Sequence, residues 1–135
     1  MEQTNALVQK KPVFKRVIPC MMVNDVQKTV NFYEQYLGFE PVQEYVNFAT
    51  VHKDHVWLEF RKTTQNMRRR AAEFNQNRDI EFLVNEIDVL YEQLKSAQVK
   101  IVSPLTINRN GNRGFEIADC NGYILLLSEF EQPII

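Results

Sequence analysis

The same order of apolar and polar positions occurs twice along the chain. An apolar stretch within Val13–Val23 leads to a polar step at Asn24 and then to an amphipathic segment that ends at Gly38. The segment Asp79–Val99 repeats this order, with its polar step at Asn85. Alternating apolar residues predict a strand, and helical spacing predicts a helix. The repeat therefore indicates two similar modules, and a ligand would most naturally lie where they meet.

Each module is expected to contain one helix with a buried stripe. Asn24 and Gln27 form a capping-box pattern at the start of the first helix, and Gly38 suits a left-handed residue at its end. The two stripes consist of Val26, Val30, Tyr33 and Leu37 in the first helix, and Ile87, Leu90, Tyr91, Leu94 and Ala97 in the second.

Alternating segments after each helix indicate antiparallel strands. Glu40–Val51 and Val56–Phe60 are expected to form a hairpin that turns at His52–His55. In the second module a strand interrupted by Pro104 precedes a hairpin that turns at Asp119–Gly122. The expected fold class is α+β: two tandem βαβββ modules form a curved mixed sheet around a shared cleft, with the helices on the convex side.

The length of 135 residues fits a single domain, which buries about two thirds of the surface of its unfolded chain. Residues 1–12 lack periodicity and are expected to be a loose arm. The run Arg68–Arg70 is expected to be a solvated face of a short surface helix in a linker. The expected parts of the domain, 1–135, are module one at about 13–61, the linker at 62–78 and module two at about 79–130.

The balance of charges narrows the class of partner. Sixteen basic and 17 acidic residues leave a formal charge of −1, without the positive field that nucleic-acid binding commonly uses. No apolar run approaches the roughly 20 residues that cross a bilayer, and the N-terminus lacks a signal-peptide pattern. Cys20 and Cys120 are expected to be free thiols. These features favour a cytoplasmic protein with no nucleic-acid or membrane partner.

Alternation also predicts which side chains look into the cleft, provided that each helix covers the opposite face of its sheet. Three carboxylates and an indole stand out on the cleft side: Glu59, Asp79, Glu81 and Trp57. The other positions expected there are Ile18, Cys20, Met22, Leu83, Ile124, Leu126 and Ser128. Trp57 could instead be a plain packing residue, and Asp79 could simply be solvated at the start of its strand.

Glu59 lies in an otherwise apolar strand, so its carboxylate needs a partner if it is buried. A ligand could supply that partner, or an arginine could form a structural ion pair; the arginines considered are Arg16, Arg109 and Arg113. His52 and His55 are expected on a turn, away from the cleft. Ser128, Cys20 and Cys120 have no evident activating base, and the four glycines form no phosphate-binding loop.

Four segments together resemble the glyoxalase/bleomycin-resistance/extradiol-dioxygenase superfamily, also called the vicinal oxygen chelate fold. They are MVNDVQKTVNFYEQYLGF, VWLEF, FLVNEIDVLYEQLKSAQV and DCNGYILLL, and they cover nearly the whole chain from about Phe14. In the enzymes of that superfamily four strand positions hold a divalent metal, typically through His and Glu. The resemblance places these positions at Ile18, Glu59, Asp79 and Leu126. Only Glu59 and Asp79 can coordinate a metal, because Ile and Leu offer no lone pair.

The lack of donor atoms at Ile18 and Leu126 resembles the metal-free branch of the superfamily, the bleomycin-resistance proteins. Those proteins sequester an antibiotic and are typically dimers with ligands in grooves between subunits. The resemblance implies a homodimer that binds a small aromatic or cationic molecule without a cofactor. Trp57, with Phe48 or Phe115, would stack on flat groups, and Glu59, Asp79 and Glu81 would attract a cation. One alternative is a metal-dependent lyase, isomerase or dioxygenase built on Glu59 and Asp79. Another is a partner-binding module with no small-molecule ligand.

Overall fold

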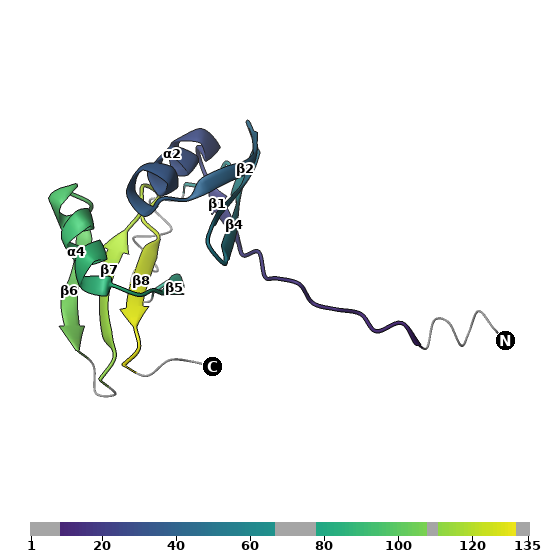
Figure 1. Ribbon diagram of the computed structural model, residues 1–135. Helices are drawn as coiled ribbons and strands as arrows, with labels where there is room; N and C mark the ends of the chain where they lie inside the picture. Colours follow the sequence, from purple (N-terminus) through teal and green to yellow (C-terminus); the bar gives the residue numbers. More distant parts are fainter. Residues whose placement is uncertain (1–8, 67–77, 108–110, 132–135) are drawn as a thin grey trace.

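Two modules follow one another along the chain, each with the order strand, helix and three strands (Figure 1). The computed structural model describes residues 9–66, 78–107 and 111–131. The first module contains β1 (Cys20–Val23), α2 (Val26–Leu37), β2 (Glu40–Tyr45), β3 (Phe48–Lys53) and β4 (Val56–Lys62). The second contains β5 (Ile80–Leu83), α4 (Ile87–Ser96), β6 (Ile101–Ile107), β7 (Arg113–Ala118) and β8 (Ile124–Glu129). The α+β class and the tandem βαβββ modules are confirmed.

Each module builds its own four-stranded mixed sheet, in the order β1-β4-β3-β2 and β5-β8-β7-β6. In each sheet the first strand runs parallel to the last, and the other pairs are antiparallel. Cys20 lies opposite Glu59 in one sheet, and Glu81 lies opposite Leu126 in the other. Among the described strands no ladder joins the two sheets, so the modules meet through side chains.

The two helices begin in different ways. Asp25 caps α2, because its Oδ1 accepts a hydrogen bond from the Lys28 N–H at 3.0 Å; the expected cap, Asn24, instead donates to the carbonyl of Thr63. The start of α4 is capped from β8, where Glu129 accepts from the Ile87 N–H at 3.1 Å. Gly38 ends α2 at a φ of 76°, as expected. Neither described helix is long and apolar enough to cross a membrane.

The first strand is shorter than the alternation predicted. Only Cys20–Val23 forms a strand with β4. Residues 9–19, which we call the arm, precede this strand; the Pro19 carbonyl accepts a hydrogen bond from the Glu59 N–H at 2.9 Å, and the N-terminal part of the arm runs away from both sheets (Figure 1). Pro19 has no N–H to donate to a neighbouring strand, so the ladder begins after it. The ring of Phe14 on this arm is 98% exposed. The linker helix and the run Arg68–Arg70 lie outside the described residues.

Two other strands differ in detail from the expectation. A turn at Val46 divides the alternating stretch Glu40–Val51 into β2 and β3, so that the expected hairpin supplies all three strands that follow the helix in the βαβββ order. Pro104 does not end β6; the register shifts between Ser103 and Thr106, the interval that contains Pro104, and also between Ile101 and Ser103. Where the register shifts, the ladder does not need a hydrogen bond from the proline nitrogen, so the strand continues past Pro104.

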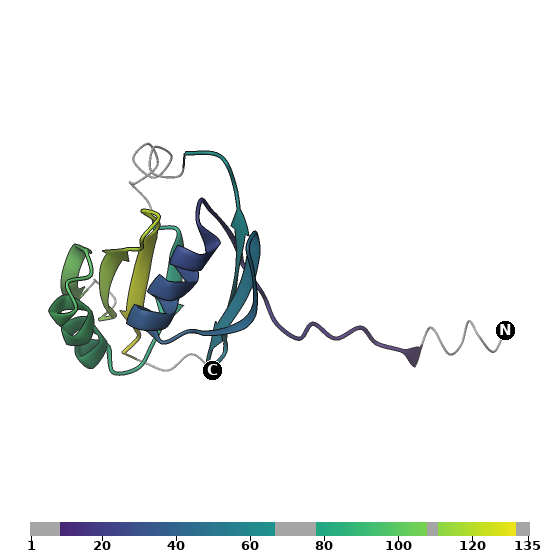
Figure 2. The same ribbon diagram turned by 90° about the horizontal axis from the view of Figure 1, so that it is seen from above.

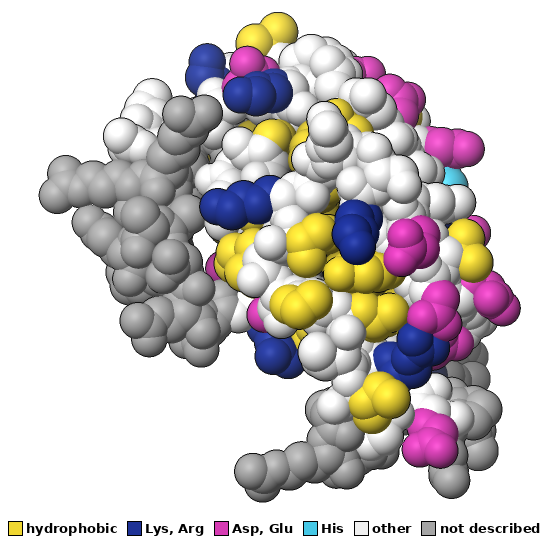
Figure 3. All heavy atoms as spheres, turned by 90° about the vertical axis from the view of Figure 1, so that its left-hand side faces the viewer, with side chains coloured by type: hydrophobic (Ala, Val, Ile, Leu, Met, Phe, Trp, Pro, Cys, Tyr) yellow, Lys and Arg dark blue, Asp and Glu magenta, His cyan; other side chains and the backbone are white. Residues whose placement is uncertain are grey.

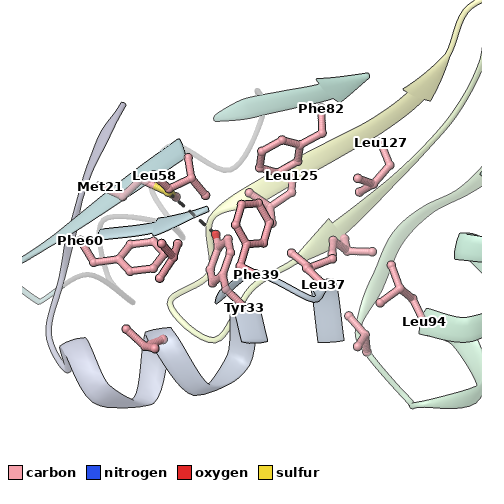
Figure 4. Close-up of a cluster of buried hydrophobic side chains, with 14 of the residues drawn as sticks. Met21, Tyr33, Leu37, Phe39, Leu58, Phe60, Phe82, Leu94, Leu125 and Leu127 are labelled. Carbon is pink, nitrogen blue, oxygen red and sulfur yellow. Dashed lines mark hydrogen bonds between the residues drawn. The ribbon is translucent and has the colours of Figure 1, made fainter. Parts of the chain in front are cut away.

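One hydrophobic core joins both modules, and α2 lies between the two sheets (Figures 1 and 2). The Tyr33 ring is fully buried and lies 4.9 Å from the ring of Phe60. Across the module boundary the rings of Phe39 and Phe82 are 6.1 Å apart, and Leu125 points into the same cluster (Figure 4). The helix-facing sides of both sheets are therefore buried in a common core.

Tyr33 and Asp119 link the modules through a buried hydrogen bond. The Tyr33 hydroxyl donates to Oδ2 of Asp119 at 2.7 Å, and Oδ1 of Asp119 accepts from the N–H groups of Asn121 and Tyr123. Asp119 opens the expected turn, which closes at Gly122 with a φ of 90°. Burial raises the pKa of Asp119, and the hydrogen bonds from Tyr33 and the turn oppose that shift. The carboxylate thus organises the turn and holds it against α2.

The outer face of the second module, formed by α4 and β6, carries apolar side chains. Figure 3 shows them gathered near the centre of this face, with charged side chains around them. Val89 on α4 and Val102 on β6 are 53% and 44% exposed. This face is separate from the arm, which leaves the first module.

Tyr33→Phe should lower the free energy of unfolding by about 1–3 kcal/mol, because a buried carboxylate loses a hydrogen-bond donor. Urea unfolding followed by circular dichroism measures the change. Tyr36→Phe is the matched control: Tyr36 lies on the same helix, packs on Phe32 and makes no side-chain hydrogen bond within the described residues. Equal stability of Tyr33→Phe and the wild type would contradict a structural role for this bond.

The raised pKa of Asp119 predicts a pH-dependent stability term. The folded state holds this proton more tightly than the unfolded state, so the free energy of unfolding should fall as pH rises from about 4 through the raised pKa. Asp119→Asn keeps an oxygen acceptor for the turn but cannot titrate. The wild-type value minus the variant value, from urea unfolding between about pH 4 and pH 8, should therefore decrease and then level off. A difference that is constant over this range would contradict the prediction.

Candidate functional site

A groove of about 740 Å³ lies between the arm, the hairpin that joins β3 to β4, and β5. The arm contributes residues 15–17 and 19, the hairpin residues 52 and 54–58, and β5 residues 80–83. We call this the inter-module groove, because both modules line it. Its size is in the range of sites that hold small organic molecules.

Trp57 lines this groove, and its half-buried indole is in contact with two other side chains. The imidazole of His52, its cross-strand partner, stacks at 5.1 Å between centroids and an interplanar angle of 22°. The guanidinium carbon of Arg16 lies 4.1 Å from the centroid of the indole. An aromatic ring and a cation therefore hold the indole in place and attach the arm to the hairpin.

The two histidines belong to the groove, which corrects the expectation that they lie on a turn away from the ligand site. His52 is in β3, because this strand continues to Lys53 before the chain turns. His55 follows Asp54, whose φ of 51° makes the tight turn. The hairpin is thus longer than the alternation suggested, and its end forms one wall of the groove.

Glu59 lies on the same face of β4 as Trp57, but it does not line the groove. Its Oε2 is 2.5 Å from Nε of Arg61, two residues along the strand, and its side chain is 20% exposed. The partner is thus none of the three arginines considered from the sequence: Arg16 lies on Trp57, Arg113 pairs with Asp88, and Arg109 is outside the described residues. Residues i and i+2 of a strand lie on the same face, so the spacing of Glu59 and Arg61 in the sequence could have indicated this partner.

Cys20 lies opposite Glu59 and is exposed. Burial of part of the thiol, followed by the Glu59 carboxylate, raises the pKa of Cys20. Burial also raises the pKa of Cys120, to about 11. Neither thiol is therefore activated as a nucleophile by its surroundings.

The two phenylalanines expected to stack on a ligand lie in different places. Phe48 is on the Trp57 face of the first sheet, under the guanidinium of Arg61 at 5.0 Å and beside the ring of Tyr45, outside the groove. Phe115 is 1% exposed and meets Tyr91 edge-on in the core. Because Phe115 pairs with Leu127, its side chain points to the helix side, so the expected stacking role of Phe115 does not agree with the structure.

The second module places its candidate residues in three environments. Asp79 accepts a hydrogen bond from the Ile124 N–H at 2.8 Å, which fastens the start of β5 to β8. Glu81 is exposed and lines the inter-module groove. It also borders a smaller hollow of about 150 Å³ on the second sheet, which contains Leu126 and the buried Ser128. Glu81 is thus the expected carboxylate that faces the groove.

The four positions that the resemblance assigns to a metal do not suit one. Ile18 lies on the arm, 43% exposed, and Leu126 lies in the hollow; neither has a donor atom. The carboxylate of Glu59 is held by Arg61, and that of Asp79 by a backbone N–H. Within the described ranges no three His, Cys, Asp or Glu side chains gather closely enough to hold a metal ion.

Comparison of the sequence with family models and comparison of the fold with solved structures point to the same family. The family model described as Glyoxalase/Bleomycin resistance protein/Dioxygenase superfamily matches residues 16–127. A search of curated proteins found no match.

Three solved structures illustrate the similarity of fold. The bleomycin-binding protein of Streptomyces verticillus, complexed with copper(II)-bleomycin, is 20% identical over 91% of this chain and 100% of its own, with a TM-score of 0.67. TioX from Micromonospora sp. ML1 is 14% identical over 86% and 98%, with a TM-score of 0.69. A glyoxalase/bleomycin resistance protein/dioxygenase from Alicyclobacillus acidocaldarius is 14% identical over 87% and 92%, with a TM-score of 0.71. Since the family model covers most of the sequence, this chain belongs to the glyoxalase/bleomycin resistance protein/dioxygenase superfamily.

Proposed function

We propose that this protein binds and sequesters a small aromatic molecule in the inter-module groove, without metal chemistry. The observation that carries the proposal is Trp57, a half-buried indole in a groove of about 740 Å³ between two modules. His52 and Arg16 contact this indole, and the part of its apolar surface that they leave uncovered can contact a flat ligand. The structural similarity to a bleomycin-binding protein supports a small-molecule ligand, and an antibiotic is one candidate.

The placement of the carboxylates bears on the class of ligand. The ligand expected from the sequence is a small aromatic or cationic molecule. Glu59 and Asp79 are engaged by Arg61 and by the backbone of Ile124, so Glu81 is the expected carboxylate left to face a cationic group. The aromatic part of the proposal therefore has the stronger support. The free thiols Cys20 and Cys120 fit a cytoplasmic location, which is part of the same proposal.

The proposal predicts ligand-dependent quenching of Trp57 without bound metal. Because Trp57 is the single tryptophan of the chain, its fluorescence reports on the groove alone. A panel of planar aromatic compounds should include some that quench it, and elemental analysis of the purified protein should find no stoichiometric divalent metal. Calorimetry should show that Trp57→Leu weakens binding of such a compound by about tenfold, whereas Phe48→Leu, outside the groove, leaves it unchanged.

Two other results would support other functions. A stoichiometric metal that a chelator removes together with activity would favour a metal-dependent lyase, isomerase or dioxygenase built on Glu59 and Asp79, and would contradict our proposal. The absence of any stabilising compound in a broad thermal-shift screen would favour a partner-binding module.

We also propose that the chain forms a homodimer through the arm. Val13 and Phe14 are 76% and 98% exposed on an extended segment that stands clear of both modules (Figure 1). Burial of such side chains against a second copy removes apolar surface from water and is favourable.

Light scattering should give a mass of about twice the 15.9 kDa of the chain. Replacing Val13 and Phe14 together with serine should shift the protein toward the monomer, because the apolar contact is lost. Val89→Ser, which changes an exposed apolar residue on α4, is the control and should leave the mass unchanged. A wild-type monomer would contradict the dimer, and a dimeric double variant would contradict the role of the arm.

A further inference from the structure

We infer that Arg16 makes the inter-module groove selective for aromatic ligands that carry a negative charge. The inference rests on the proposed function, because it names the chemistry of the ligand that the same groove would take. It assigns to the arm a role in ligand recognition that the alternation of the sequence does not indicate.

Arg16 differs from the other described arginines in its partner. The other three each lie near a carboxylate, in the pairs Arg61–Glu59, Arg78–Glu116 and Arg113–Asp88. Within the described part of the chain, no carboxylate lies within 4.0 Å of the Arg16 guanidinium, which lies on Trp57. An exposed guanidinium at the wall of a groove therefore keeps its charge available for a ligand.

The contact with Trp57 leaves the donors of Arg16 free. The guanidinium carbon lies over the indole, 4.1 Å from its centroid, and within the described residues the guanidinium makes no hydrogen bond. The N–H donors lie in the plane of the guanidinium and point away from its edge. A carboxylate, sulfonate or phosphate can accept two of these hydrogen bonds side by side. The indole thus holds the cation in a fixed position for an anionic group.

The walls of the groove provide a place for the aromatic part of such a ligand. β5 contributes Ile80, Phe82 and Leu83, and Leu83 is 50% exposed. Leu83 lines the same groove as Trp57 and Arg16, whereas Phe82 belongs to the common core and Ile80 packs against it. A flat ring against this apolar wall would leave its charged substituent beside the arm.

The other charges of the groove agree with this orientation. Lys15 is the second cation of the arm that lines the groove. Of the two carboxylates that line the groove, Asp54 lies 4.0 Å from Nζ of Lys53, and Glu81 is on β5, which is the other wall. The arm side of the groove is therefore cationic, and the negative end of a ligand should lie there.

A matched pair of fluorescent probes tests the selectivity. 1-Anilinonaphthalene-8-sulfonate and N-phenyl-1-naphthylamine share the same ring system, and only the first carries a sulfonate. Both accept energy from excited tryptophan, so titration of the full-length protein can be followed through Trp57 alone. The wild type should bind the sulfonate probe about tenfold more tightly than the neutral probe, the range of one charge-assisted contact.

Arg16→Gln should abolish this preference, because the affinity for the sulfonate probe should fall about tenfold more than the affinity for the neutral probe. Lys11→Gln removes the same charge from the same arm but outside the groove, so this variant should keep the preference. Both positions are exposed, so neither substitution should affect folding. Far-ultraviolet circular dichroism of each variant checks this point.

Three results would overturn the inference: equal affinity of the wild type for both probes, an unchanged preference in Arg16→Gln, or an equal loss in Lys11→Gln. If the neutral probe quenches Trp57 and the sulfonate gains nothing, the proposed binding function stands while the role of Arg16 fails. If neither probe quenches Trp57, the proposed function fails and the inference fails with it.

Discussion

The contact between the buried Tyr33 side chain and Asp119 determines how the two modules sit together. The tyrosine comes from α2 of the first module, and the aspartate opens the turn between β7 and β8 of the second. The carboxylate is buried, so it needs several donors, and it obtains one from the hydroxyl and two from the backbone of its own turn. The ring meanwhile packs on Phe60. One residue thus takes part in both the apolar core and the polar link between the modules.

The inter-module groove follows from this arrangement. Because the helix-facing sides of both sheets are buried in the common core, the opposite side of β4 carries the residues that remain available for other contacts. That side holds Trp57, Glu59 and Arg61, together with His52 from β3. Most of its charges are neutralised by neighbours on the same sheet. The arm adds Arg16, whose charge is not neutralised by a neighbouring carboxylate in the described part of the chain. The groove therefore has a positive charge that a ligand can meet.

Membership of the superfamily leaves the chemistry of this chain open, because a fold can keep its framework while the side chains of its site change. The register of the sheets makes this concrete. Glu59 and Leu126 occupy matching places in the two modules, opposite Cys20 and Glu81. One of the two is a carboxylate tied to arginine, and the other is an aliphatic side chain. The similarity between the modules therefore extends to the backbone and to the core, but not to the donor groups.

The sequence by itself determined the two modules, the stripe of α2, the turn at Asp119–Gly122 and the face of β4 on which Trp57 and Glu59 lie. It determined the stripe of α4 except for Ala97, which is exposed and follows the end of that helix. These features depend on periodicity, which is a property of neighbouring residues. Only the tertiary structure decided that the arm leaves the sheet, that Phe115 lies in the core and that Arg16 lies on Trp57. Such contacts depend on which segments that are distant in the sequence meet in the fold, and the spacing of residues along the chain does not indicate this.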